Sequence, residues 1–180
     1  MATIPTLRID APYSLADGRS LQFGPITRAS RPLIERAVAE LSPLTSYRRF
    51  FTVRYRLSDA ELDALTVLVG VDRFGVGASI RDATGARGVG VARFVRDRAR
   101  PHVADLALLV VDAFQGVGVG RTLLARLASA ALARGIDTFR GMVLLDNTPM
   151  LRLLRVLAPD LRLSRVDDYY DVEVPLAAAR

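Results

Sequence analysis

The sequence contains no cysteine and no lysine. Without cysteine, the chain has no disulfide, no thiol nucleophile and no thiolate metal ligand, which fits a reducing compartment. We therefore predict a cytoplasmic protein without a metal site. Because all 25 basic residues are arginine, the chain also has no lysine side chain that could itself be acylated.

Long apolar runs are missing as well. No stretch approaches the ~20 apolar residues that span a bilayer, and the N-terminus lacks the apolar segment of a secretory signal. We therefore expect no membrane association. The 180 residues suffice for a single hydrophobic core, and we predict an N-terminal arm over residues 1–19 followed by one domain over residues 20–180.

A concentrated basic tract is absent, although the net charge is +6. The arginines are scattered along the chain, so we expect no nucleic-acid partner. The excess positive charge would still attract a small polyanion such as a phosphate-rich cofactor.

Local signals in the first third of the chain predict a short strand and three helical segments. Residues 21–26 have the pattern of a strand. Ser30 is placed to cap a first helix, residues 44–51 form a second and partly helical piece, and Ser58 has capping-box spacing with Glu61.

The remainder of the chain alternates between strand and helix patterns. The run over residues 103–111 is almost entirely apolar, which indicates a strand covered on both faces. The order of elements predicts an α/β fold with a mixed, mostly antiparallel sheet and helices on both faces. Around the central strand we expect a hairpin of residues 74–81 and 87–95, a helix from Val119 to Gly135, a strand over 138–145, a helix capped by Thr148, and a closing hairpin of 161–165 and 169–174.

A glycine-rich turn, Gln115–Arg121, joins the central strand to the next helix. Glycines at 116, 118 and 120 leave backbone N–H groups free and allow a ligand to approach the main chain closely, which suits a phosphate. A Walker-type loop is excluded because it requires a lysine. A dinucleotide turn matches poorly, since the spacing is G-x-G-x-G in mid-chain and Asp137 precedes the following strand instead of ending it.

The pattern Gln-x-x-Gly-x-Gly, formed by Gln115, Gly118 and Gly120, resembles the acetyl-CoA signature of the GCN5-related N-acetyltransferases (GNAT). The order of elements from residue 20 to 174 also looks like that family's, and Asn147 follows the next strand, where the family often has an asparagine beside the cofactor. The segments around residues 41–51, 104–107 and 146–150 are similar to the bacterial branch that acetylates protein lysines.

This resemblance implies acetyl-CoA as cofactor and a set of residues that bind it. The strand backbone would hold the pantetheine arm and the turn would hold the pyrophosphate. The implied cofactor-binding residues are Leu109, Val110, Val111, Gln115, Gly116, Val117, Gly118, Val119, Gly120, Arg121, Thr122, Asn147 and Met150.

Acetyl transfer to an amine needs a base, because a free lysine has a pKa of ~10.4 and is protonated at neutral pH. Asp105 matches the position of the branch's catalytic glutamate but is one methylene shorter. The alternative for Asp105 is a strand-end carboxylate paired with Arg93 or Arg100. Many relatives also have a tyrosine in the helix after Asn147 to protonate the thiolate, and residues 151–157 contain none.

The predicted function is acetyl-CoA-dependent N-acetylation of a primary amine. A protein lysine is the favoured acceptor, with a small-molecule amine as an alternative, and the protein is expected to be a monomer or a homodimer. A non-catalytic acyl-CoA-binding or regulatory module is the remaining alternative, supported by the shortened carboxylate and the missing tyrosine. Arg48 and Arg49 are predicted to be surface or ion-pair residues.

Overall fold

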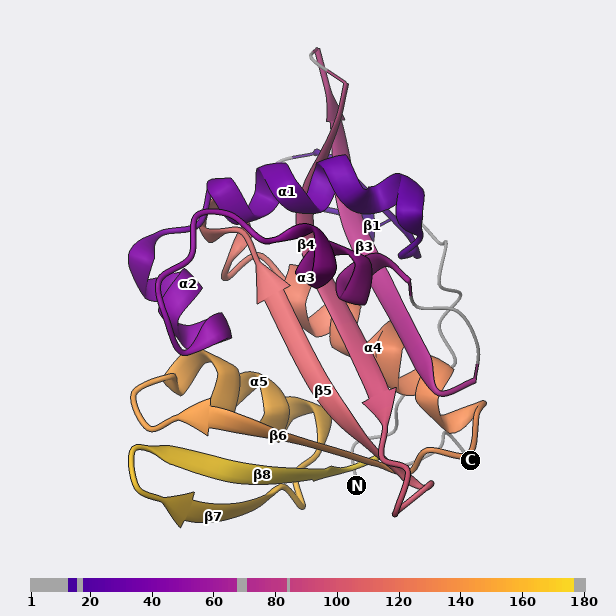
Figure 1. Cartoon of the computed structure of the whole chain (residues 1–180), viewed down its shortest axis with the longest axis vertical. Coiled ribbons are helices and arrows are strands. Elements are labelled where there is room, and N and C mark those ends of the chain that lie inside the picture. Colours follow the sequence, from indigo (N-terminus) through magenta and orange to yellow (C-terminus); the bar gives the residue numbers. More distant parts are fainter. Residues whose placement is uncertain (1–12, 16–17, 68–70, 84, 177–180) are drawn as a thin grey trace.

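The computed structural model of the chain describes residues 13–15, 18–67, 71–83 and 85–176. Its helices and strands follow the expected order (Figure 1). The elements are β1 (Tyr13–Ser14), β2 (Ser20–Pro25), the 3₁₀ turn η1 (Arg28–Ser30), α1 (Arg31–Ala39), α2 (Pro43–Phe50), α3 (Asp59–Thr66), β3 (Arg73–Asp82), β4 (Gly85–Arg96), β5 (Val103–Val110), the 3₁₀ turn η2 (Asp112–Phe114), α4 (Val119–Leu132), β6 (Thr138–Leu144), α5 (Thr148–Leu157), β7 (Arg162–Val166) and β8 (Tyr169–Pro175).

The described strands form one sheet in the order β1-β2-β3-β4-β5-β6-β8-β7. The β5–β6 pair is parallel, and the other neighbouring strands are antiparallel. Helices α1 to α3 lie in front of the sheet in Figure 1, and α4 lies behind it. The predicted mixed, mostly antiparallel sheet with helices on both faces is therefore confirmed.

Two apolar clusters fill the space on the two faces of the sheet. The larger cluster joins the sheet to α4 and α5 and includes Phe94, Leu127 and Phe139, each almost fully buried. The smaller cluster lies under α1 to α3 and includes Val38 and Leu109. Burial of each such side chain contributes ~1.5–3 kcal/mol, and this packing fixes β5 between the two helical layers.

Several helix boundaries follow from the capping residues that the sequence indicates. The Ser58 hydroxyl accepts from the Glu61 N–H at 3.3 Å, and the Glu61 carboxylate accepts from the Ser58 N–H at 2.8 Å. Helix α4 is followed by Gly135, whose φ of +73° is left-handed. One prediction was wrong by a residue: Asn147, and not Thr148, is the N-cap of α5, because its Oδ1 accepts from the Met150 N–H at 3.3 Å.

The structure changes the predicted boundaries of the β3–β4 hairpin and of the N-terminal segment. Strands β3 and β4 are longer than expected and leave a two-residue loop. At the N-terminus, Tyr13 and Ser14 pair with β2 and Leu15 is buried. The rest of the expected arm, residues 1–12 and 16–17, lies outside the described residues, and the division into arm and domain stays a prediction.

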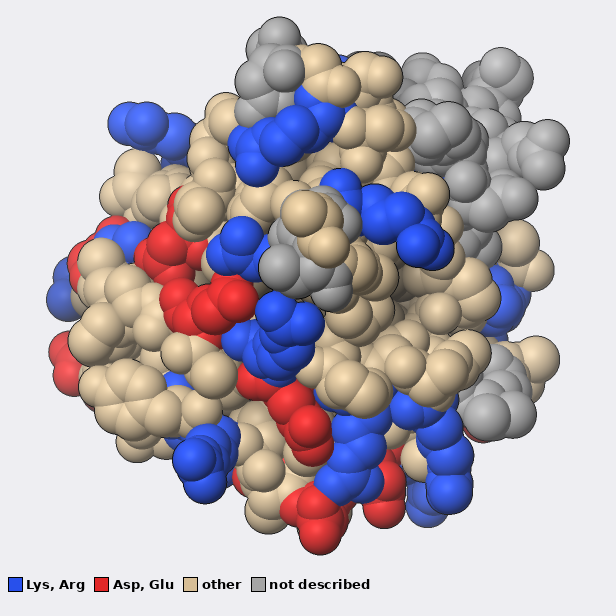
Figure 2. Space-filling model, turned by 90° about the horizontal axis from the view of Figure 1, so that it is seen from above, with Lys and Arg blue, Asp and Glu red and all other residues tan. Residues whose placement is uncertain are grey.

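Charged side chains of both signs are interspersed on the face shown in Figure 2. Arg31 on α1 pairs with Glu35 at 3.3 Å and with Asp59 and Asp63 of α3, and Arg87 pairs with Glu40 at 2.7 Å. Exposed pairs of this kind contribute little to stability. Among the described residues, no helix is long and apolar enough to cross a membrane.

Candidate cofactor and acetyl-transfer site

Strands β5 and β6 pair over only three residues and then separate. The parallel register joins Val103 to Thr138, Ala104 to Phe139 and Asp105 to Arg140. Beyond these pairs the two strands diverge as a V in Figure 1. The later part of β5 therefore has one edge paired with β4 and the other edge facing a gap in the sheet.

Hydrogen bonding to β4 shows which β5 backbone groups face this gap. The Val111 N–H donates to the Val89 carbonyl at 2.9 Å. Since antiparallel residues alternate in the direction of their backbone groups, the N–H groups of Leu108 and Val110 are directed to the opposite edge. The N–H groups of Leu109 and Val111 are directed to β4, and those of Leu108 and Val110 face the gap.

The turn after β5 requires glycine at two positions. Gly116 and Gly118 have φ values of +76° and +93°, where other residues are strained. A Cβ on Gly118 would also lie 2.8 Å from the Tyr13 hydroxyl oxygen. Gly118 is the N-cap of α4, and the first N–H groups of a helix lack intrahelical acceptors. The turn therefore presents free donors at the positive end of the helix dipole.

The third glycine keeps α4 close to α5 and to the central strand. A Cβ on Gly120 would lie 3.2 Å from Leu153 Cδ2, 3.6 Å from Leu108 Cδ2 and 3.6 Å from Val110 Cγ2. Two neighbouring residues have other roles: Val119 is fully buried, and the N–H and hydroxyl of Thr122 donate to the Gly118 carbonyl at 3.0 and 3.1 Å.

Side chains at the start of the turn attach α2 to it. Gln115 Nε2 donates to the Val110 carbonyl at 3.0 Å and to Thr45 Oγ1 at 3.2 Å. Asp112 accepts from the Ser42 N–H at 3.0 Å, the Ser42 hydroxyl at 2.6 Å and the Thr45 hydroxyl at 2.7 Å. These bonds bring the N-terminus of α2 beside the turn.

Asp112→Asn is expected to destabilise the fold by about 1 kcal/mol at neutral pH, a small value because the carboxylate is exposed. Burial raises the pKa of Asp112, but hydrogen bonds from Ser42 and Thr45 lower it by more, so the net pKa lies below its ordinary value. The carboxylate of Asp112 therefore contributes its full stabilisation above the ordinary pKa of ~3.9. This stabilisation is lost as the pH falls through the lower pKa of Asp112 in the folded protein.

Urea denaturation of both proteins between neutral pH and pH ~3 measures this effect. The stability difference should close at the acidic end, and the exposed Asp160→Asn should show no comparable difference. A stability difference between the two proteins that stays constant across this pH range would mean that the charge of Asp112 is not involved.

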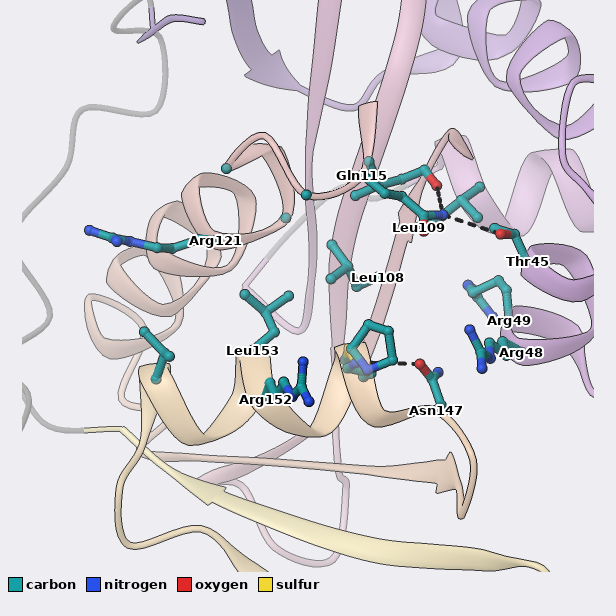
Figure 3. Close-up of a pocket in the computed structure, with 17 residues that line it drawn as sticks. Thr45, Arg48, Arg49, Leu108, Leu109, Gln115, Arg121, Asn147, Arg152 and Leu153 are labelled. Atoms are coloured by element: carbon teal, nitrogen blue, oxygen red, sulfur yellow. Dashed lines mark hydrogen bonds between the residues drawn. The ribbon is translucent and has the colours of Figure 1, made fainter. Parts of the chain in front are cut away.

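A cavity of about 410 Å³ lies between the later part of β5, the glycine turn, α2 and α5. Its size is within the usual range for ligand sites. Four arginines line it, and no aspartate or glutamate does so among the described residues. Figure 3 shows Arg48 and Arg49 at the end near Asn147 and Arg121 at the opposite end. The composition of the lining favours an elongated anionic ligand.

Nine of the predicted cofactor-binding residues line this cavity. The structure brings together Leu109, Val110, Gln115, Gly116, Gly118, Gly120, Arg121, Asn147 and Met150. Of the other four, Val111 and Val119 are buried, Val117 is exposed, and Thr122 makes the bonds described above. Eight further residues line the cavity and were not predicted from the sequence: Thr45, Arg48, Arg49, Leu108, Pro149, Arg152, Leu153 and Val156.

Asp105 lies outside the cavity, at the closed end of the V. Its side chain is 56% exposed and accepts from Arg140 Nε at 2.6 Å, not from Arg93 or Arg100. Arg140 also pairs with Asp97 at 2.8 Å, and its pKa is raised chiefly by the hydrogen bond to Asp105. Along β5, Asp105 precedes Leu109 by four residues, or ~13 Å. Because side chains alternate between the two faces of a strand, both residues lie on the face covered by α1 to α3.

A profile of the acetyltransferase (GNAT) family matches residues 53–158, which is more than half of the chain. The chain therefore belongs to the acetyltransferase (GNAT) family. Within the family it is similar to proteins named Pat. The crystal structure of the GNAT domain of S. lividans PAT superposes with a TM-score of 0.80 at 29% identity, covering 92% of this chain and 96% of that one.

Two further relatives come from mycobacteria. The acetyltransferase Pat of Mycolicibacterium smegmatis is 35% identical over 115 residues, which is 64% of this chain and 34% of that protein. A cAMP-binding acyltransferase from Mycobacterium smegmatis has a TM-score of 0.61 at 27% identity, over 92% of this chain and 47% of that one. The chain thus spans about a third of the first relative and half of the second. The predicted resemblance to the GNAT family and its Pat-like branch is confirmed.

Proposed function

We propose that this chain transfers an acetyl group from acetyl-CoA to a primary amine, with a protein lysine as the favoured acceptor. The observation that carries the proposal is the cavity beside the later part of β5, which joins a glycine turn with free N–H donors to a lining that contains arginines and, among the described residues, no carboxylate. The family and the Pat-like relatives support the same reaction.

The residues of the cavity fit coenzyme A in two respects. The turn from Val117 to Arg121 would bind the pyrophosphate through backbone N–H groups, with added charge from Arg121 and Arg152. A side chain at Gly120 would meet Leu153 and Leu108, which line this cavity. The gap-facing N–H groups of Leu108 and Val110 would bind the amide groups of the pantetheine arm.

Bound acetyl-CoA supplies the acetyl group as a thioester that an amine can attack. On the protein side, one of the N–H groups of Leu108 and Val110 would stabilise the negative charge on the thioester oxygen. Asp105 would accept the proton of the acceptor ammonium, directly or through a water, while Arg140 holds its carboxylate in place. Residues 151–157 contain no tyrosine to act as an acid, and a thiol pKa of ~8.5 makes the thiolate a tolerable leaving group without one.

The favoured acceptor follows from the charge and exposure of the site. A deep acidic pocket would indicate a polyamine or aminoglycoside, whereas the described lining of this cavity is basic. Apolar side chains of α2 and the segment after it are exposed: Leu44 by 51%, Tyr47 by 45% and Tyr55 by 58%. Thr45 and Arg48, the neighbours of the first two in the sequence, line the cavity. A protein surface suits these features better than a small polycation.

A non-catalytic acyl-CoA-binding module is the second candidate function. It is favoured by the position of Asp105 outside the cavity and by its ion pair with Arg140. Release of free thiol from acetyl-CoA, measured with a panel of lysine peptides and amines, separates the two. Tight cofactor binding without turnover on any acceptor would favour the module over the enzyme.

Acetyl-CoA is expected to bind at least about 100-fold more tightly than NAD or ATP, because the cavity continues from the phosphate turn along β5 and accommodates an extended arm. Isothermal titration calorimetry with the three ligands measures this difference. Equal affinity for ATP or NAD would contradict the assignment to coenzyme A.

A further inference from the structure

Two arginines beside the acetyl-transfer site have no carboxylate partner among the described residues. Arg49 on α2 lines the cavity, and its guanidinium lies 4.9 Å from the ring centre of Phe50. Arg93 on β4 makes a single long hydrogen bond, 3.5 Å, to the Ala64 carbonyl of α3. Its Nε is buried and has no hydrogen-bond partner. In contrast, Arg48 pairs with Asp146 at 3.5 Å.

The strand register places Arg93 between the cavity and Asp105. Arg93 is opposite Ala107 on β5, Val91 is opposite Leu109, and Val95 is opposite Asp105. Directly opposite residues of antiparallel strands project to the same face. Arg93 therefore lies on the face of Leu109 and Asp105, under α1 to α3, and diagonally adjacent to the proposed base.

Both guanidinium groups lie in surroundings that disfavour their positive charge. Burial lowers the pKa of Arg49 to about 10, and the charge of Arg93 contributes to the decrease. Burial also lowers the pKa of Arg93, with a further contribution from Arg73, while Asp105 opposes it. Asp105 is hydrogen-bonded to Arg140 instead. Half-buried cations that form no ion pair are costly to the protein, and an anionic ligand beside them would relieve this cost.

We propose that Arg49 and Arg93 form a carboxylate-binding subsite for the acceptor, so that the preferred lysine is flanked by an acidic residue. Guanidinium groups bind carboxylates with strong, charge-assisted hydrogen bonds. Arg93 lies beyond the cavity lining on the Asp105 side, which places the anion on the acceptor and not on the cofactor. This inference rests on the proposed acetyl transfer, and it names the substrate class of the same site.

The test compares two peptides that differ only in having glutamate or glutamine on both sides of a lysine. The wild-type protein should acetylate the glutamate peptide with a KM about fivefold lower. Arg49→Gln and Arg93→Gln should each remove this preference, measured at saturating acetyl-CoA as the ratio of the KM values for the two peptides. Arg36→Gln, on the exposed surface of α1, serves as the matched control and should retain the preference.

Binding of the acetylated product peptides, measured by calorimetry in the presence of coenzyme A, provides a readout that needs no turnover. The same fivefold preference should appear there and should be lost in both glutamine variants. Arg49→Lys should restore part of it, since the charge is kept. Thermal melts establish that each variant is folded.

Three results would overturn the subsite: no preference for glutamate in the wild-type protein, a preference that survives in both variants, or a preference lost equally in Arg36→Gln. If succinyl-CoA replaces acetyl-CoA with a lower KM and Arg49→Gln abolishes that advantage, the carboxylate belongs to the acyl group and the acceptor assignment is wrong. Failure of the proposed function gives a different result, because no peptide is acetylated while the product-peptide measurements still report on the subsite.

Discussion

Replacing Gly118 by valine is expected to weaken acetyl-CoA binding about thirtyfold, equivalent to about 2 kcal/mol. At a φ of +93° an L residue is strained, and its Cβ would collide with the Tyr13 hydroxyl. The turn would have to change its backbone angles to accept valine. Its N–H groups would then no longer point together at a phosphate, and calorimetry with acetyl-CoA measures the loss.

Gly135→Val is the matched control for this prediction. Gly135 follows α4 at a φ of +73°, and a Cβ there would meet nothing within 4 Å. Both variants should lower the melting temperature because both place a β-branched residue in left-handed backbone. Only Gly118→Val should lose cofactor affinity. Wild-type affinity in Gly118→Val would remove the turn from the site, and an equal loss in Gly135→Val would attribute the effect to stability.

Asp105→Asn is expected to lower turnover at least about tenfold near neutral pH and to leave the affinity for acetyl-CoA unchanged. An amide cannot accept the proton that the acceptor ammonium must lose. The deficit should shrink as the pH approaches the ~10.4 pKa of a free lysine, since the amine then loses its proton without help. Steady-state kinetics across this pH range, with calorimetry at each end, measure both parts.

Asp97→Asn is the control that distinguishes a role of Asp105 as base from its role as an ion-pair partner of Arg140. Asp97 and Asp105 both bond to Arg140, at 2.8 and 2.6 Å, so either substitution removes one carboxylate partner of this arginine. If Asp105 is the base, only Asp105→Asn slows the reaction strongly. Equal rates for wild type and Asp105→Asn would exclude Asp105 from the mechanism, and equal losses in the two variants would indicate that the Arg140 pairs act through structure.

The fold and the position of the glycine turn could be predicted because their signals are local. Apolar periodicity, the capping box at Ser58 and the glycines at 116, 118 and 120 each act over a few neighbouring residues. Asn147 shows the limit of this reasoning, since two adjacent residues were both suitable caps and only the backbone determined which one accepts from the Met150 N–H.

The rest of the site depends on contacts between distant segments. Thr45 and Gln115, which form a hydrogen bond, are 70 positions apart in the sequence. Arg49 lines the cavity only because α2 packs against the end of β5. Arg152 was missed for a similar reason, because the approach of α5 to α4 depends on their packing at Gly120. The partner of Asp105 could not be predicted, because Arg140 is opposite it only through the short parallel register of β5 with β6.

The short register between β5 and β6 also gives the sheet an internal edge. Ordinarily an unpaired strand edge is a place where another chain can add and start aggregation. Here residues of α2 and α5 line the cavity beside that edge, so helices cover it. A ligand with amide groups and a slender chain can still enter and complete the hydrogen bonding. If the proposed function is correct, an edge that most sheets must cover serves here as part of the cofactor site, because its N–H groups would bind the amides of the pantetheine arm.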